Sequence, residues 1–279
     1  MRFQATMKSR MSGPTPVLFT DLDGTLLDHD TYSWEPARTA LERLKLERIP
    51  WLLVTSKTRA EVELWRRRLG NTHPFIVENG GAAFIPSGYF PRAATGAIAR
   101  DGYEVIEWGK PYPELVASLE AAARASGCQV RAFHDMTVEE IAAATNLPLE
   151  QAALAKQREY DEPFHIVDEE RGGALLAALE AQGLRWTRGG RFHHVDGNND
   201  KASATAALRE RFERVYGPVV TIGLGDGLND VPLLNAVDIP VVIRSPAADA
   251  VKLRVAHALV TEGAGPAGWN QAVMTMLRG

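Results

Sequence analysis

Short apolar runs alternate with amphipathic stretches at both ends of this chain of 279 residues. Near the start, strand-length runs occur at 16–21 (PVLFTD), 51–56 (WLLVTS), 75–79 (FIVEN) and 82–86 (AAFIP). Residues 34–48 and 59–69, which lie between these runs, show apolar side chains at helical spacing. Strands that alternate with helices in this way predict a parallel sheet with helices on both faces.

The same alternation returns in the last third of the chain. Strand candidates occur at 219–226, 239–243 and 258–261, and helix candidates at 201–216, 231–236 and 247–256. The two ends therefore predict one α/β unit, a Rossmann-like core made of residues 15–87 and 191–279.

The middle of the chain differs in composition and pattern, because it is rich in alanine and glutamate and has few strand-length apolar runs. Helices are expected at 115–125, 137–145, 148–156 and 173–182, and Thr137 with Glu140 fits a capping box at the start of the second. We expect residues 88–190 to form a second, inserted α+β domain, and residues 1–14 to be a loose leader.

Composition excludes several classes of function. The net charge of −4 gives no basic surface for nucleic acid, and no apolar run reaches the ~20 residues that cross a membrane. The single cysteine, Cys128, excludes an internal disulfide, and the first sixteen residues lack the apolar stretch of a secretory signal. We expect a cytoplasmic protein without nucleic-acid or membrane partners.

Polar side chains follow three of the predicted strands. Asp21, Ser56 and Asp226 each come at the end of a strand candidate. In a parallel sheet, ligands bind beyond the carboxyl ends of the strands, so these three residues are expected at one place. Asp21 and Asp23 lie close together in VLFTDLDGT (17–25), and two such carboxylates ionise together only with a cation nearby.

Carboxylate oxygens are the ligands that Mg²⁺ prefers. Asp21 and Asp226 are therefore expected to bind the metal, and Asp230 in GDGLND to bind it directly or through water. A carboxylate whose charge is screened by a metal can attack the phosphorus of a phosphate ester and form an aspartyl-phosphate. Asp21, the last residue of its strand, is the expected nucleophile.

The neighbouring residues suit the other tasks of phosphoryl transfer. Asp23 is expected to protonate the leaving alkoxide and then to accept a proton from the attacking water. Gly24 and Thr25 allow close approach of the backbone to the phosphoryl oxygens, while Ser56 donates a hydrogen bond and Lys201 balances the negative charge. Each motif alone also fits an ordinary turn, strand end or surface helix; their joint occurrence at strand ends indicates catalysis.

These motifs resemble the haloacid dehalogenase superfamily of phosphohydrolases. The resemblance rests on DLDGT (21–25), the hydroxyls at 55–56, Lys201 and GDGLND (225–230). It implies an aspartyl-phosphate mechanism with Mg²⁺, which binds the carboxylates of Asp21 and Asp226 and the backbone carbonyl of Asp23. It also implies that the inserted domain is a cap of the C2 type.

Other segments resemble the mannosyl-3-phosphoglycerate phosphatases within that superfamily. They are TSKTRAEVE (55–63), ENGGAAF (78–84), HDMTVEE (134–140), AKQREYDEPF (155–164) and GGRFHHVDGNNDK (189–201). That family has Ser-Lys-Thr at the second motif, which favours Ser56 over Thr55 as the phosphate ligand, and it carries glycine where this chain has Ala202.

A substrate of this kind carries a phosphate, a carboxylate and sugar hydroxyls, so the cap must offer cations and polar groups. Lys156, Gln157 and Arg158 meet that need and are expected to bind substrate. The same three residues fit a salt-bridged helix end equally well. His134 is a further candidate. The pair His193-His194 is expected to pack or to contact substrate rather than to bind metal.

The sequence therefore predicts a Mg²⁺-dependent phosphatase that acts on mannosyl-3-phosphoglycerate and forms mannosylglycerate. Three alternatives stay open: a phosphatase for another sugar phosphate, such as glucosyl-3-phosphoglycerate or sucrose phosphate; a phosphosugar mutase; and a sensor that binds a sugar phosphate without turnover. Release of inorganic phosphate separates the first from the other two. The oligomeric state is left open by the sequence.

Overall fold

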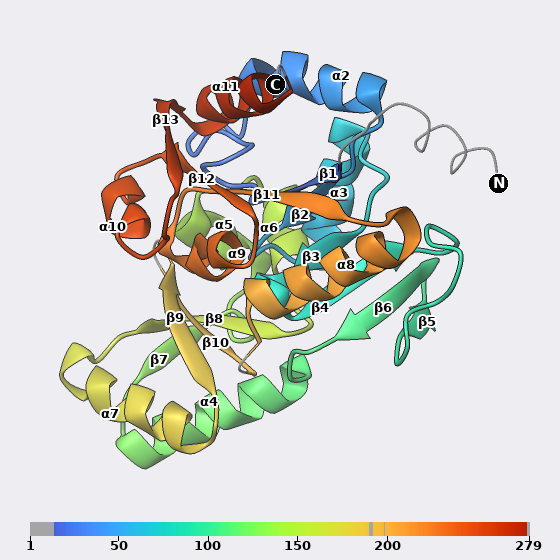
Figure 1. Ribbon diagram of the computed structural model, residues 1–279. Helices are drawn as coiled ribbons and strands as arrows, with labels where there is room; N and C mark the ends of the chain where they lie inside the picture. The colour runs from blue at the N-terminus through green and yellow to red at the C-terminus, as the bar shows by residue number, and fades with distance from the viewer. Residues whose placement is uncertain (1–13, 190–191, 198, 278–279) are drawn as a thin grey trace.

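The computed structural model describes residues 14–189, 192–197 and 199–277, and in this part the chain forms a larger and a smaller sheet (Figure 1). The expected leader, residues 1–14, lies outside the described residues except for Pro14. The strand order in the larger sheet is β13-β12-β11-β1-β2-β3-β4-β6-β5. The strands from β13 to β3 are parallel, and β4, β6 and β5 are added antiparallel. Their bounds are β1 (Thr15–Thr20), β2 (Trp51–Val54), β3 (Phe75–Val77), β4 (Ala82–Pro86), β5 (Ile98–Arg100), β6 (Tyr103–Glu107), β11 (Val219–Gly225), β12 (Ile239–Arg244) and β13 (Leu259–Ala264).

Helices cover both faces of this sheet, because the strand residues that point toward one face and those that point toward the other are both apolar. Leu18 of β1 packs into a core with α2 (Arg38–Glu47), α3 (Arg59–Leu69) and α11 (Gly265–Met276). Val17 and Phe19 face the opposite side, where α8 (Lys201–Tyr216) and α9 (Val231–Asn235) pack. The short helix α10 (Ala248–Lys252) packs against β12, and single 3-10 turns form η1 (Glu35–Ala37), η2 (Glu78–Gly80) and η3 (Leu228–Asp230). The expected Rossmann-like α/β core is confirmed.

The smaller sheet is antiparallel, with the order β7-β8-β10-β9. Its strands are β7 (Val130–Ala132), β8 (Asp161–Ile166), β10 (Phe192–Asp196) and β9 (Arg185–Gly189). The helices α4 (Tyr112–Ser126) and α7 (Glu169–Ala181) cover one face. A second apolar cluster joins Phe133 and Phe192 to α5 (Val138–Thr145) and α6 (Leu149–Ala155). Thr137 and Glu140 form the expected capping box of α5.

The limits expected for the inserted domain, residues 88–190, do not coincide with the limits of the segment that forms the smaller sheet. β5 and β6 fall within 88–190 but pair in the larger sheet, where Val105 is buried in the core. β10 falls within 191–279 but pairs in the smaller sheet. The chain crosses between the sheets after Glu107 and returns before Lys201. We propose these crossings as the limits of the cap.

The start of α3 joins the core to the cap. Thr58 and Glu61 form a capping box there, in which the side chain of each accepts the backbone N–H of the other. The Thr58 hydroxyl also donates a hydrogen bond of 3.0 Å to the carbonyl of Leu154 in α6. In the described ranges, no helix combines the length and apolar character needed to cross a membrane.

Candidate active site

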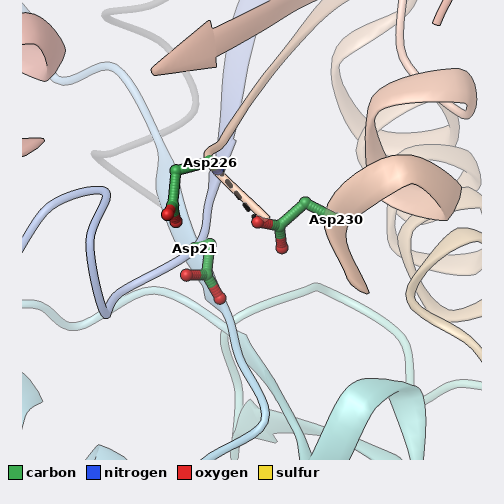
Figure 2. Close-up of side chains that lie close together, drawn as sticks. All are labelled: Asp21, Asp226 and Asp230. Atoms are coloured by element: carbon green, nitrogen blue, oxygen red, sulfur yellow. Dashed lines mark hydrogen bonds between the residues drawn. The ribbon is translucent and has the colours of Figure 1, made fainter. Parts of the chain in front are cut away.

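Three carboxylates from two neighbouring strands meet at the carboxyl edge of the larger sheet. Asp21 follows β1, while Asp226 and Asp230 follow β11, and β1 pairs with β11. One carboxylate oxygen of each lies within 4.8 Å of those of the other two. Figure 2 shows the three side chains close together, and Asp230 belongs to the turn η3 beyond the end of β11. Residues about 200 positions apart in the sequence therefore lie together at this edge of the sheet, as their places at strand ends predict.

The turn after β11 holds Asp230 in place. One oxygen of its carboxylate accepts hydrogen bonds of 3.0 Å from the backbone N–H groups of Asp226 and Gly227. The first of these bonds is the dashed line in Figure 2. The other oxygen of Asp230 lies 2.6 Å from Lys201 Nζ. Because both oxygens are held, the orientation of this buried carboxylate is fixed.

Lys201 is the cation of the cluster. It is the first residue of α8, which Asp200 caps by accepting the N–H of Ser203, and its Nζ also lies 2.8 Å from Asp21 Oδ1. Burial alone lowers the pKa of an ammonium, but the attraction of Asp21 and Asp230 outweighs it and raises the pKa of Lys201. Lys201 therefore stays charged and fixes one oxygen of Asp21.

The three carboxylates carry more negative charge than one lysine balances. Burial raises the pKa of Asp21 well above its usual range, and repulsion from Asp230 adds to this. Burial and Asp230 also raise the pKa of Asp226 to about 6. A buried site made only of oxygen donors with excess negative charge fits a hard divalent cation such as Mg²⁺.

Gly24 and Thr25 place the carboxylate of Asp226. The Thr25 hydroxyl donates a hydrogen bond of 2.9 Å to Asp226 Oδ1. Gly24 has a left-handed φ of +74°, and a Cβ at this position would lie 2.7 Å from Asp226 Oδ2. The tight turn of DGT is therefore packed directly against the second carboxylate.

Asp23 lies apart from the three-carboxylate cluster and pairs with Lys57. Its Oδ2 is 2.9 Å from Lys57 Nζ, whereas its Oδ1 is buried and has no hydrogen-bond partner in the part of the chain that the structure describes. Lys57 Nζ also lies 3.3 Å from Glu61 and 5.2 Å from the centre of the Tyr32 ring. One carboxylate oxygen of Asp23 is thus paired with Lys57, and the other has no partner among the described residues.

The two hydroxyl residues after β2 have different surroundings. Thr55 is buried, and its hydroxyl accepts a hydrogen bond of 3.2 Å from the backbone N–H of Lys57. Ser56 lines a cavity of about 150 Å³ between the core and the cap. Asp23 and Lys57 of the core line the same cavity, and Phe192 and His194 are among the cap residues that line it.

The expected substrate ligands of the cap occupy different places. Arg158 lines the cavity, and its guanidinium donates to the carbonyl of Ser56 at 2.9 Å. Lys156 donates to the carbonyl of Met136, and the exposed Gln157 donates to that of Ala153. His134 is held by Glu162 at 2.8 Å. Of these four, Arg158 alone is among the residues that line the cavity.

Comparisons with known proteins agree with this arrangement. A sequence profile of the haloacid dehalogenase-like hydrolases matches residues 18–90. A protein of Methanococcoides burtonii called glucosyl-3-phosphoglycerate/mannosyl-3-phosphoglycerate phosphatase is 43% identical over 266 residues, which are 94% of this chain and 97% of that protein. The chain belongs to the haloacid dehalogenase-like phosphatases. The expected family is confirmed, and the chain is a phosphoric monoester hydrolase.

Further relatives of this phosphatase bear related names. A protein of Persephonella marina with the same double name is 42% identical over 264 residues, which are 94% of this phosphatase and 97% of that protein. The mannosyl-3-phosphoglycerate phosphatase of Pyrococcus furiosus is 39% identical over 222 residues, which are 80% of this phosphatase and 88% of that enzyme.

Solved structures show that the fold extends over nearly the whole phosphatase. A phosphatase of the haloalkanoate superfamily from Bacteroides thetaiotaomicron superposes with a TM-score of 0.65 and 22% identity, and the match covers 95% of this chain and 96% of that one. A protein of Thermoplasma acidophilum gives a TM-score of 0.66 at 16% identity and covers 95% and 99%. At these identities the likeness concerns the fold alone.

Sequence reasoning missed Lys57 and assigned no definite task to His194. Lys57 directly follows Ser56 and lies four residues before Glu61, a spacing that places it beside Glu61 at the start of α3. That spacing was the available signal. The position of His194 in the cavity wall has no such local signal, because it depends on how the cap meets the core.

Proposed function

We propose that this phosphatase hydrolyses mannosyl-3-phosphoglycerate to mannosylglycerate and inorganic phosphate, with Mg²⁺ as cofactor. One observation carries the proposal: the Asp21 cluster lies at a strand edge beside a cavity that Asp23 shares with the cap, in a chain 43% identical to a relative with that activity in its name. Because that relative is also named for the glucosyl ester, glucosyl-3-phosphoglycerate is the second candidate substrate.

Asp21 is the proposed nucleophile. One of its carboxylate oxygens bonds to phosphorus, and the bond between phosphorus and the glycerate oxygen breaks with its electron pair on that oxygen. Asp23 gives its proton to the departing alkoxide, then accepts a proton from the water that attacks the phosphorus of the aspartyl-phosphate. Inorganic phosphate leaves, and Asp21 is regenerated as a carboxylate.

Lys201 and Ser56 are proposed to stabilise the negative charge on the transferring group, Lys201 through its contact with Asp21 and Ser56 through its hydroxyl. The carboxylates of Asp21, Asp226 and Asp230 are the proposed holders of Mg²⁺, with the backbone carbonyl of Asp23 as a further ligand. When bound, the cation supplies charge neutralisation for the approach of a carboxylate to a phosphate.

A phosphate-release panel tests the proposal. Mannosyl-3-phosphoglycerate, its glucosyl analogue, sucrose phosphate and hexose phosphates are assayed with Mg²⁺ and with a chelator. We expect kcat/KM for the two phosphoglycerate esters to exceed that of the hexose phosphates by about two orders of magnitude, or roughly 2.7 kcal/mol. Highest activity on sucrose phosphate or hexose phosphates would reject the substrate. Isomerised ester without phosphate release would identify a mutase, and binding without turnover a sensor.

The nucleophile is tested separately with Asp21→Asn. This variant is expected to keep the far-UV circular dichroism spectrum and to lose phosphate release by at least about four orders of magnitude, because the neutral amide cannot form the phosphoenzyme. Near-normal turnover of Asp21→Asn would contradict the assignment.

A further inference from the structure

Among the described residues, the polar side chains of the cap that line the cavity are those of Thr145, Arg158 and His194. The Thr145 hydroxyl donates to the carbonyl of Ile141 at 2.6 Å. The guanidinium of Arg158 is used by two carbonyls and a carboxylate: Nε donates to Ala155, and NH1 donates to Ser56 and to Asp161. The Thr145 hydroxyl proton and the Nε and NH1 groups of Arg158 are therefore engaged within the protein.

His194 is different. It lies on β10 and lines the same cavity as Asp23 and Ser56. Its Nδ1 lies 2.9 Å from Asp161 Oδ2, and its Nε2 has no hydrogen-bond partner among the residues that the structure describes. Because the bond at Nδ1 fixes the ring, Nε2 is the atom left for a ligand.

Asp161 orients the ring from behind. Its carboxylate is buried and accepts hydrogen bonds from both His194 and Arg158, at 2.9 and 3.2 Å. In an imidazolium both ring nitrogens are donors, so with Nδ1–H directed at Asp161 the Nε2–H group complements an anion such as a carboxylate.

We propose that His194 recognises the carboxylate of the glycerate group and thereby selects phosphoglycerate esters over other phosphate esters. The inference rests on the proposed function, since it assigns a contact to the same substrate. Nε2–H donates to one carboxylate oxygen, while Asp161 acts as a positioning residue. Asp23 lines the same cavity, so in this proposal the carboxylate lies toward His194 and the phosphate ester, two carbon atoms away, toward Asp23.

The test compares mannosyl-3-phosphoglycerate with its carboxamide, which has nearly the same shape but no carboxylate charge. We expect the wild-type enzyme to prefer the acid by about tenfold or more in kcat/KM, the effect of one charged hydrogen bond. In His194→Ala and His194→Gln the preference falls to about one, mainly through KM. The conservative Gln variant, with thermal melting followed by circular dichroism, separates this loss from misfolding.

His193→Ala is the matched control. His193 is the adjacent residue of β10, and its ring stacks on Phe164, with ring centroids 5.5 Å apart, rather than lining the cavity. This variant is expected to keep the acid-to-amide preference. Asp161→Asn is expected to raise KM for the acid several-fold and to leave kcat nearly unchanged, whereas a merely structural role would lower kcat for acid and amide alike.

The outcomes separate the two proposals. If the wild-type enzyme releases no phosphate from mannosyl-3-phosphoglycerate, the proposed function is rejected and this inference with it. If the wild-type enzyme turns over the ester and His194→Ala keeps the acid-to-amide preference, the inference alone is rejected. An equal loss on acid and amide would also reject it, because His194 would then act on a group that both compounds share.

Discussion

Substitution of Gly24 by alanine tests whether the DGT turn places the second carboxylate of the cluster. Gly24 has a φ of +74°, so any side chain there costs about 1 kcal/mol for the left-handed conformation. The added Cβ would also lie 2.7 Å from Asp226 Oδ2 and 3.0 Å from its Cγ. Since packed atoms seldom approach so closely, the carboxylate has to move by roughly 0.5 Å.

Gly88 provides a matched control because it separates the backbone cost from the contact. Its φ is +77°, and a Cβ added to Gly88 would have open space for 4 Å around it. Gly88→Ala should therefore lower the free energy of unfolding by about 1 kcal/mol and leave catalysis unchanged. Both variants are measured by urea denaturation and by phosphate release over a range of Mg²⁺ concentrations.

Gly24→Ala is expected to lower kcat/KM by about two orders of magnitude and to raise the Mg²⁺ concentration needed for half-maximal activity, because displacements below 1 Å in a catalytic site have effects of this size. The reasoning would be refuted if Gly24→Ala and Gly88→Ala showed the same activity and the same Mg²⁺ dependence. That result would mean that the position of Asp226 does not depend on its contact with the turn.

Two further predictions concern buried charge. Lys57→Met removes the cation between Asp23 and Glu61 and is expected to cost about 2–3 kcal/mol in urea denaturation, whereas the exposed Lys252→Met should cost under about 0.5 kcal/mol; equal costs would contradict the pairing. The pKa of Asp226 is raised from 3.8 to about 6, so the metal-free protein binds this proton more tightly when folded, and about 3 kcal/mol of stability present below pH 3.8 should be lost by about pH 6. Mg²⁺ should therefore raise the melting temperature more at pH 7 than at pH 5, and an equal rise at both would count against a metal at this carboxylate.

The helices and parallel strands of the core were predictable because their signals are local. The predicted limits 59–69 and 201–216 coincide with α3 and α8, where a capping box and an N-cap aspartate define the starts. The helix α11 was not predicted, since its first turn contains two glycines and a proline, and its helical period is weak. β5 and β6 were not predicted as strands, and only the pairing of β6 with β4 shows that they belong to the larger sheet.

The residues of the candidate site also differ in whether a local signal in the sequence predicts their position. Residues at strand ends could be gathered from the sequence because the parallel sheet fixes where those ends lie. Lys57 follows Ser56 beyond the end of β2 and could have been gathered in the same way, and its contact with Asp23 joins the ends of β1 and β2. The place of His194 could not be predicted in this manner, because it depends on the docking of two sheets.

The ENGG segment shows how that docking is built into the core. It connects β3 to β4, and Glu78 and Asn79 both adopt left-handed φ values, 46° and 54°, at a cost of roughly 1–3 kcal/mol each. The carboxylate of Glu78 is buried and accepts the backbone N–H groups of Glu159 and Tyr160, at 2.8 to 3.2 Å. These bonds offset the strain and fix the cap segment that also carries Arg158. Since Arg158 in turn holds the carbonyl of Ser56, the cap wall and the loop after β2 are tied together at the cavity.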